Sequence, residues 1–565
     1  MAAVRNEYQL HPAMTHWRHG QRGGHTLLND AWRRQLERDP DLSEAILCVQ
    51  LVFGADYELH LATKKCSTTS SFTGKKVNFQ GVLANSAEVA WEYEPGEANS
   101  VAKTLSLRLP NALVDAAALV RQARVLAGVA EVSLQVDGGD YDDRLVLMRG
   151  DLTDVKYSAV TQLVSCTVAD PKGSVDLHLP PYTLTSDRFT NIINASVGQV
   201  LAVVMPSFGG IQGWFVDNHP TAPEVVVCHG HLDVDTVYVD GVAYSDVSPI
   251  FPWSVLHGVD RLGAPYTAVQ FNGGTGTFDG EGGEKVYVEL SGGPTSGNPV
   301  QVVRRLVEQH TTLGVPGANA LLFGRAEARS GYLLGRCCAN ASGSGNVKAL
   351  EFIEGSLLES FPMLSMVWAG GGYAPVYTDR KAGLPAFRLV ADQHPVLDRA
   401  TSVAELPKTD CFNTFSIQYN YQPLDDEFLG YAERTPANSA LCELSRRVTG
   451  ERHADTIESL YITDAQVAEL VMDWLVAHRT MPAHDVAYDV SPGLVVQLVL
   501  GDNVALDDAE FGWDDTVATV RRLVYRPARG ELGLRVWNDA VELSGATSVG
   551  GGTTGGIGSG NGGGD

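Results

Sequence analysis

The chain has 565 residues, 44% of them hydrophobic and 19% charged, which indicates a globular protein too long for one core. Its formal net charge of −25 repels phosphate backbones and argues against a dedicated nucleic-acid binder. Residues 1–24 lack the apolar core of a secretory signal, and no run of about 18 apolar residues predicts a membrane span. The eight cysteines are scattered without a CxxC pair, which favours free thiols made in a reducing compartment.

The N-terminal part predicts an arm with one helix over residues 1–45, followed by a first β unit over residues 46–185. Residues 27–38 repeat apolar side chains at helical spacing and stop at Asp39-Pro40. The β unit has one helix pattern, at residues 111–127. Its strand patterns lie at residues 46–53, 58–62, 103–109, 132–136, 145–148 and 163–168. Short strands around an inserted helix predict a small barrel or sandwich.

Beyond Pro180-Pro181, glycine and proline turns separate short strands, which predicts a sandwich-like β module over residues 186–295. Its clearest strand patterns lie at residues 225–228, 236–241 and 285–290.

Residues 296–405 have the pattern of a mixed α+β module. Pro299 opens a helix at a favourable first position, and a second helix is expected from about residue 347 to 361. Asn346 is its expected N-cap, and Pro362 ends it. A hairpin is predicted over residues 363–377.

A second β unit is predicted over residues 406–541. Its alternating strand at 412–421 is followed by an amphipathic helix over residues 464–479, for which Thr463 and Gln466 form a capping box. The face predicted to be apolar consists of Val467, Leu470, Val471, Trp474 and Leu475. Further strands are expected at residues 485–490, 501–506 and 517–537. Residues 542–565 are a glycine-rich tail that cannot bury enough surface to fold alone.

The most conspicuous chemical motif is His229-Gly-His231-Leu-Asp233, directly after an apolar run. Strand alternation would place the two imidazoles and the carboxylate on one side, ready to converge on zinc. Binuclear metallohydrolases need a histidine directly after the aspartate, however, and this chain has Val234 there. Neither His257 nor His310 lies in a recognisable metal-binding context, so the alternative is a polar strand end in a β module.

Clustered carboxylates occur at Asp507-Asp508, at Asp514-Asp515 and at Asp425-Asp426-Glu427. Paired acids hydrolyse glycosides when they face each other across a cleft, but adjacent residues in a loop point apart. The chain has no nucleophile elbow, no HExxH motif, no phosphate loop and no dinucleotide fingerprint. The sequence therefore predicts no catalytic residue, no metal ligand and no cofactor, and the protein is not expected to be an enzyme.

Taken in order, these segments resemble the tail-tip (baseplate) hub proteins of long-tailed bacteriophages and gene transfer agents. The resemblance covers most of residues 29–541. The matching segments are residues 45–54, 58–61, 105–111, 145–151, 230–241, 298–308, 349–362, 368–377, 413–421 and 463–537. Two features depart from the family. Its Pro-Gly-Asp turn is split into Pro492-Gly493 and Gly501-Asp502, and neither the first 28 residues nor the glycine-rich tail has a clear counterpart.

The resemblance implies a homotrimer around an axial channel, and a mainly β, multidomain fold with α+β parts. Residues 46–185 and 406–541 would each form a small tube-type β-barrel, so that three subunits mimic a six-fold ring. That ring would dock on tail-tube and distal tail proteins, and the outer modules would hold central fibre or receptor-binding proteins. The hub would be made in the host cytoplasm and would end in the virion, at the tail tip.

In such a hub, DNA would be contacted only in passing, and an acidic lumen would keep it from adhering. No stable nucleic-acid or membrane binding is expected. Two other interpretations remain open from the sequence. One is a β-rich tail-associated hydrolase acting on cell-surface glycan or cell wall. The other is a glycan-binding adhesin, because β modules with exposed tryptophan and tyrosine often bind sugars.

Overall fold

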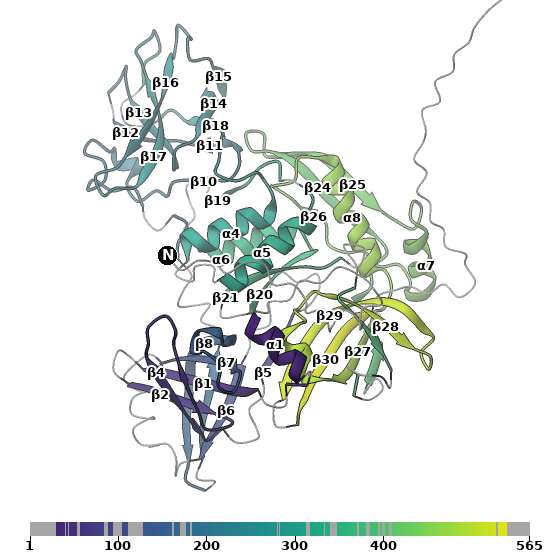
Figure 1. The fold of residues 1–565 in the computed structure, drawn as a ribbon. Coiled ribbons are helices and arrows are strands. Elements are labelled where there is room, and N and C mark those ends of the chain that lie inside the picture. The colour runs from purple at the N-terminus through teal and green to yellow at the C-terminus, as the bar shows by residue number, and fades with distance from the viewer. Residues whose placement is uncertain are drawn as a thin grey trace, which may run out of the picture.

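The computed structural model describes residues 30–538 with internal gaps, of which the longest are 94–103, 111–127, 170–176 and 340–346. The helix predicted at 111–127, the cap predicted at Asn346 and the glycine-rich tail lie outside the described residues. The prediction of a mainly β, multidomain chain with α+β parts is confirmed. Figure 1 shows two large sheets side by side at one end, helices in the middle and a β module at the other end.

The first large sheet has eight strands in the order β3-β4-β2-β1-β7-β8-β9-β6. Their bounds are β1 Ile46–Phe53, β2 Tyr57–Ala62, β3 Cys66–Thr69, β4 Lys76–Gly81, β6 Thr104–Pro110, β7 Gly128–Gln135, β8 Leu145–Ser158 and β9 Leu163–Ala169. Alternation in β1 sends Leu47, Val49 and Leu51 into the largest hydrophobic core, because neighbouring side chains of a strand point to opposite faces. Helix α1, Asp30–Arg38, packs Trp32 and Leu36 into the same core.

The second large sheet has seven strands. Six follow the order β22-β28-β29-β30-β27-β23, and β5 pairs with β29 beside β28. The bounds are β5 Val89–Glu92, β22 Phe387–Val390, β23 Ser402–Glu405, β27 His484–Val490, β28 Asn503–Asp508, β29 Trp513–Arg526 and β30 Glu531–Asn538. This sheet thus recruits strands from three distant parts of the chain. Within the described residues, neither large sheet closes into the barrel that the resemblance implied.

The β module at the far end of the molecule consists of two four-stranded sheets, with orders β11-β18-β14-β15 and β12-β13-β17-β16. Their bounds are β11 Phe208–Gln212, β12 Trp214–Asp217, β13 Glu224–His229, β14 Asp233–Val239, β15 Val242–Tyr244, β16 Trp253–Val259, β17 Pro265–Phe271 and β18 Val286–Ser291. Both sheets contribute to one core, for example Phe215 and Val269 from one and Val237 and Val288 from the other. We call this part the insertion module.

Three helices of the described part of the chain lie at the centre of the molecule, and the first of them has a side-chain cap. Helix α4, Pro299–His310, has Asn298 as its N-cap, whose side chain accepts a 2.9 Å hydrogen bond from the Val300 amide. The next helices are α5, Gly317–Arg329, which was not predicted, and α6, Ala349–Phe352. The latter continues as π and 3-10 turns to Ser360, and Lys348 provides no side-chain cap. The predicted hairpin is formed by β20, Leu364–Ala369, and β21, Gly372–Tyr377.

A three-stranded sheet, β25-β24-β26, with helices α7 and α8 completes the fold. Its elements are β24 Phe415–Gln422, β25 Glu427–Arg434, β26 Ile457–Glu458, α7 Ala440–Thr449 and α8 Ala465–Arg479. The capping box predicted for α8 is wrong, because Asp464, not Thr463, accepts the 2.8 Å hydrogen bond from the Gln466 amide. Its apolar face is only partly as predicted: Val467, Val471 and Trp474 are buried, whereas Leu470 is 41% exposed.

Candidate functional site

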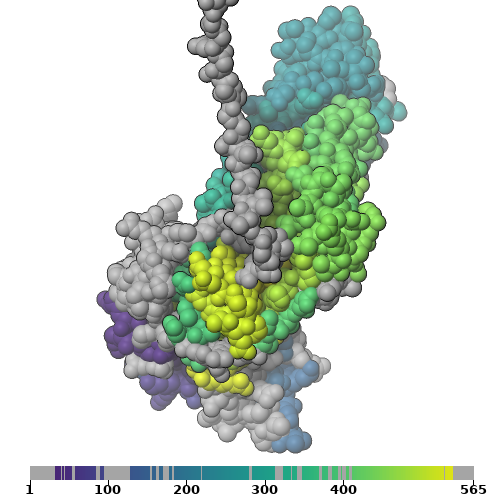
Figure 2. All heavy atoms as spheres, turned by 90° about the vertical axis from the view of Figure 1, so that its right-hand side faces the viewer, coloured from purple at the N-terminus to yellow at the C-terminus, as the bar shows by residue number. Residues whose placement is uncertain are grey.

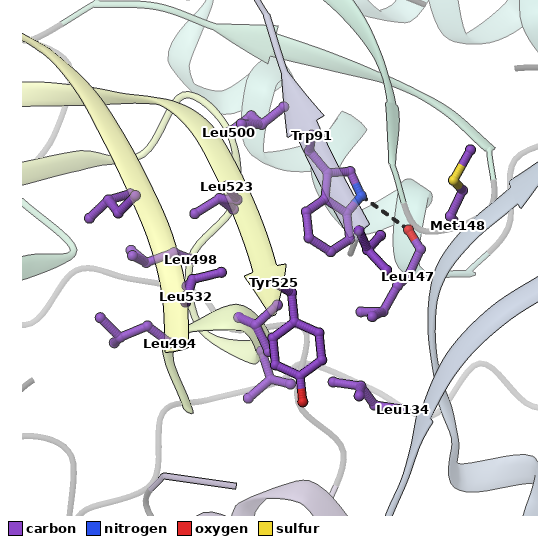
Figure 3. Close-up of a cluster of buried hydrophobic side chains, with 14 of the residues drawn as sticks. Trp91, Leu134, Leu147, Met148, Leu494, Leu498, Leu500, Leu523, Tyr525 and Leu532 are labelled. Carbon is purple, nitrogen blue, oxygen red and sulfur yellow. Dashed lines mark hydrogen bonds between the residues drawn. The ribbon is translucent and has the colours of Figure 1, made fainter. Parts of the chain in front are cut away.

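The most distinctive feature of the structure is a seam between the two large sheets, where one core belongs to both. It contains Val132 and Leu147 from the first sheet together with Leu506, Leu523 and Leu534 from the second. Figure 3 shows leucines of the two sheets on either side of Trp91 and Tyr525. Burial of this apolar surface at about 25 cal/mol per Å² holds the sheets together as one body.

Strand β5 forms the centre of the seam. It precedes β6 of the first sheet in the chain, yet its residues pair with β29 of the second, with Trp91 opposite Leu523 and Val89 opposite Tyr525. The Trp91 indole Nε1 donates a 3.1 Å hydrogen bond to the carbonyl oxygen of Leu147 in β8. The strand is therefore bonded to one sheet by its backbone and to the other by a side chain.

Hydrogen bonds between distant segments extend the seam. The hydroxyl of Tyr93, just after β5, lies 3.1 Å from the hydroxyl of Thr378, just after β21. The Trp32 indole of α1 donates to the Asp143 carbonyl at 3.0 Å, and the Ser491 hydroxyl donates to the Asp41 carboxylate at 2.7 Å. These bonds join α1 to the β7–β8 connection of the first sheet, and the segment just after α1 to the residue that follows β27 of the second.

The seam contains little charge. Arg522 Nε of β29 lies 3.5 Å from Glu92 Oε2 of β5, in a half-buried ion pair that adds to the strand pairing. Burial raises the pKa of the Tyr525 hydroxyl well above its ordinary value, so this group stays protonated at neutral pH.

The structure does not bring His229, His231 and Asp233 together on one side of a strand. His229 ends β13, Gly230 turns the chain with a φ of 90°, and Asp233 begins β14. The predicted alternation fails because of this turn. His231 Nε2 donates to the Gly258 carbonyl at 3.1 Å, and its ring lies 5.2 Å from that of His257.

His229 instead faces helix α4, where its ring centroid lies 6.2 Å from that of His310. His310 is 5% exposed, and its Nδ1 has no hydrogen-bond partner within the described part of the chain. Burial, then the neighbouring His229 and Arg305, lower the pKa of His310 to about 4. Two neutral imidazoles therefore pack at the junction between the insertion module and the central helices.

Four acidic residues of the C-terminal unit line a surface pocket of about 520 Å³, whose lining consists of Val390, Ala391, Asp507, Asp508, Ala509, Glu510, Gly512, Trp513 and Asp514. The two adjacent carboxylates point apart, as expected. Asp507 forms an ion pair with Arg388 and accepts a hydrogen bond from the Asp515 amide at 2.6 Å. Asp508 is 3% exposed and accepts from the Glu510 amide at 3.0 Å.

This pocket does not show the geometry of a paired-acid active site. Arg388 neutralises Asp507, and Asp514 is 94% exposed. Among the residues that the structure describes, no group of three or more His, Cys, Asp or Glu side chains is placed to hold a metal ion. The acidic segment 425–427 lies elsewhere, in the turn between β24 and β25.

Strand β5 was not predicted from the sequence, and the seam was therefore not predicted either. The alternation of Val89, Trp91 and Tyr93, which are all buried, is a strand pattern that could have indicated β5. Its partner strand lies more than 400 residues away in the chain, and backbone pairing over that distance leaves no local pattern.

No family model matches the chain, and no curated protein matches it. Among solved structures, it is similar to the tail protein from Neisseria meningitidis MC58, with 9% identity and a TM-score of 0.38, over 87% of this chain and 97% of that chain. A second similar structure is the 43 kDa tail protein of prophage MuSo2 from Shewanella oneidensis, with 11% identity and a TM-score of 0.29, over 87% and 98% of the two chains. The structural neighbours are thus phage tail proteins, the class that the sequence resembles. Similarity of this degree carries no functional argument, so function has to be argued from the seam.

Within the described residues, no helix is long and apolar enough to cross a membrane.

Proposed function

We propose that this protein is a structural component of a phage tail, a trimeric tail-tip hub that closes the end of the tail tube. The seam is the observation that carries the proposal. It joins one sheet from the N-terminal part and one from the C-terminal part into a single wall with one core. A ring of six such sheets needs three subunits, each of which holds its two sheets at a constant angle.

The proposal assigns different tasks to the two ends of the molecule. Figure 2 shows the insertion module at one end and the two sheets at the other. The sheets would form the ring and contact tail-tube and distal tail proteins. The insertion module would stay free for central fibre or receptor-binding proteins.

The negative net charge of the chain supports the proposal that DNA passes through a channel in the hub. Each chain carries a formal net charge of −25, so three chains around an axis repel a phosphate backbone. DNA in the lumen would be contacted transiently and released, which is what genome ejection requires. A hub also needs no active site, in keeping with the ion-paired and hydrogen-bonded state of Asp507.

The test is the mass and symmetry of the purified full-length chain. Light scattering coupled to size-exclusion chromatography is expected to give a particle of three times the 60.6 kDa chain mass. Electron microscopy is expected to show a three-fold ring with six lobes around a channel. A chain that stays monomeric at high concentration, and also with tail-tube protein present, would overturn the proposal.

The hydrolase alternative is tested with the same preparation on purified cell wall and surface glycan. We expect no release of soluble fragments. The informative variant is Asp508→Asn in the acidic pocket, and the matched control is Asp426→Asn in the exposed turn between β24 and β25. Release of fragments that is lost in Asp508→Asn and retained in Asp426→Asn would show that the protein is a hydrolase and would overturn the hub proposal.

A further inference from the structure

Strand β1 carries a second, smaller apolar cluster on the face that points away from the seam. It consists of Ile46, Cys48, Ala62, Val77 and Phe79, with Cys66 and Tyr141 packed against it. The cluster forms because alternation in β1 sends Ile46 and Cys48 to the face opposite Leu47 and Val49. The β3–β4 hairpin covers this face.

The backbone attaches the hairpin weakly to the rest of the sheet. Strand β4 pairs with β2 in parallel through two residue pairs, Leu61 with Gln80 and Ala62 with Gly81. At the hairpin tip, the amides of Ser71 and Phe72 donate to the carboxylates of Asp140 and Asp142 at 3.1 and 3.0 Å. The hydroxyls of Thr68 and Ser70 also donate to the Gly139 carbonyl and the Asp142 carboxylate, at 2.7 and 2.8 Å. The small apolar cluster lies between these polar contacts and the short pairing with β2.

Two thiols meet in this cluster. Cys48 is 1% exposed, whereas Cys66, at the start of β3, is partly exposed to solvent. The neighbouring Cys48 thiol lowers the pKa of Cys66, and the Cys66 thiol raises that of Cys48. Solvent reaches Cys66 and not Cys48, so Cys66 is the thiol that a dissolved oxidant can meet first.

We propose that Cys48 and Cys66 are a modification site, at which an intramolecular disulfide locks the β3–β4 hairpin over strand β1. The geometry that carries this is the packing of the two side chains in one cluster, from two segments with a sparse backbone connection. The oxidant is a small-molecule disulfide of the glutathione class. The inference goes beyond the proposed function and holds for a monomer as well as for a hub.

The exchange proceeds in two steps that balance. The Cys66 thiolate attacks one sulfur of the oxidant, which forms a mixed disulfide and releases one thiolate that takes up a proton. Cys48 then loses its proton to solvent and attacks the Cys66 sulfur, which expels the second thiolate. Two protein thiols become one disulfide, and one small disulfide is reduced to two thiols.

The test treats the native full-length protein with oxidised glutathione and counts thiols after denaturation without reductant. Two of the eight thiols are expected to disappear, with a mass loss of about 2 Da and a peptide that links Cys48 to Cys66. Hydrogen exchange in residues 66–81 is expected to slow on oxidation. Eight free thiols after treatment, or a cross-link between other cysteines, would overturn the proposal.

Single substitutions distinguish the attacking thiol, Cys66, from the thiol that completes the disulfide, Cys48. Cys48→Ala is expected to leave Cys66 as a stable mixed disulfide with glutathione, whereas Cys66→Ala should leave Cys48 unmodified. The matched control is Cys411→Ala, a buried thiol outside the cluster, which should keep the cross-link. A Cys66 that stays as the glutathione adduct in the otherwise unaltered chain would also contradict the inference.

Discussion

The indole of Trp91 and the backbone of Leu147 are joined by a hydrogen bond of 3.1 Å that links the two large sheets. Trp91 lies in a strand that pairs with the second sheet, and Leu147 lies in a strand of the first. This relationship makes the two sheets one body, although their residues come from opposite ends of the chain. A subunit with a rigid pair of sheets can form a closed ring with its copies, whereas a hinged pair cannot set a constant angle.

Replacement of Trp91 tests the seam. Trp91→Ala removes a large buried side chain and is expected to destabilise the two sheets by about 3–5 kcal/mol. Trp91→Phe keeps a ring but removes the donor, at a cost of about 1 kcal/mol for the hydrogen bond alone. Chemical denaturation followed by hydrogen exchange in β8 and β29 measures both effects.

The matched control for this prediction is Trp253→Ala in the insertion module. Trp253 is also buried and also donates its indole hydrogen to a backbone carbonyl, that of Tyr244, at 2.9 Å. Both alanine variants should lose stability, but only the Trp91 variant should lose the proposed trimer. Equal loss of assembly in the two variants would show that the seam has no special part in it.

The insertion module contains a buried carboxylate, Asp260, and removal of its charge should destabilise this module. It accepts amide hydrogen bonds from Leu262 and Ala264 at 2.9 Å and pairs with Arg188 at 2.5 Å. Burial raises the pKa of Asp260, but these hydrogen bonds and Arg188 outweigh burial and lower it overall. Asp260→Asn is expected to cost about 1.5–3 kcal/mol at pH 7, as for a hydrogen bond to a charged group.

The pH dependence of that loss has a definite sign. Because the folded pKa of Asp260 lies below its ordinary value of 3.8, its stabilisation is complete above about pH 4 and declines as the pH falls further. The variant should therefore differ from the unaltered protein at pH 7 and approach it in strong acid. Asp455→Asn, which alters an exposed carboxylate between α7 and β26, is the control and should leave the melting curve unchanged at both pH values. A constant difference across the pH range would contradict this assignment.

His310, at the end of helix α4 where it meets the insertion module, should give the protein a second acid transition at higher pH. Its folded pKa of about 4 lies below the ordinary value of 6.5, so the unfolded chain binds the extra proton first. Stability should therefore decline as the pH falls from 6.5 towards 4. The groups that face the pair of imidazoles are Arg305 and, near His229, Asp260 and Arg188.

The measurement is the melting temperature between pH 7 and 4.5. His310→Leu should flatten the pH dependence, since a leucine cannot take up a proton. His453→Leu is the control, because it also removes an imidazole, from a side chain that is 61% exposed. If His453→Leu reduced the pH dependence of the melting temperature as much as His310→Leu, the buried pair of imidazoles would not be the source of that dependence.

Much of the fold could be predicted because strand alternation and helix caps are local. Strand β1, the hairpin of β20 and β21 and the start of helix α4 at Pro299 follow from their own residues. The arrangement of strand β5 could not be predicted, since its partner is chosen by long-range packing. The histidine motif failed for a different reason, because Gly230 takes a positive φ and ends the alternation between His229 and His231.

The start of helix α8 shows how close a local prediction can come and still be wrong. The pattern of Thr463 and Gln466 predicts a capping box, but the Asp464 carboxylate accepts from the Gln466 amide at 2.8 Å. Asp464→Ala is therefore expected to destabilise the helix by about 1 kcal/mol, the usual cost of a lost N-cap. Thr463→Ala should cost less, since its hydroxyl does not cap α8. Denaturation of both variants, with hydrogen exchange over residues 465–468, distinguishes them, and a larger loss in Thr463→Ala would restore the capping box.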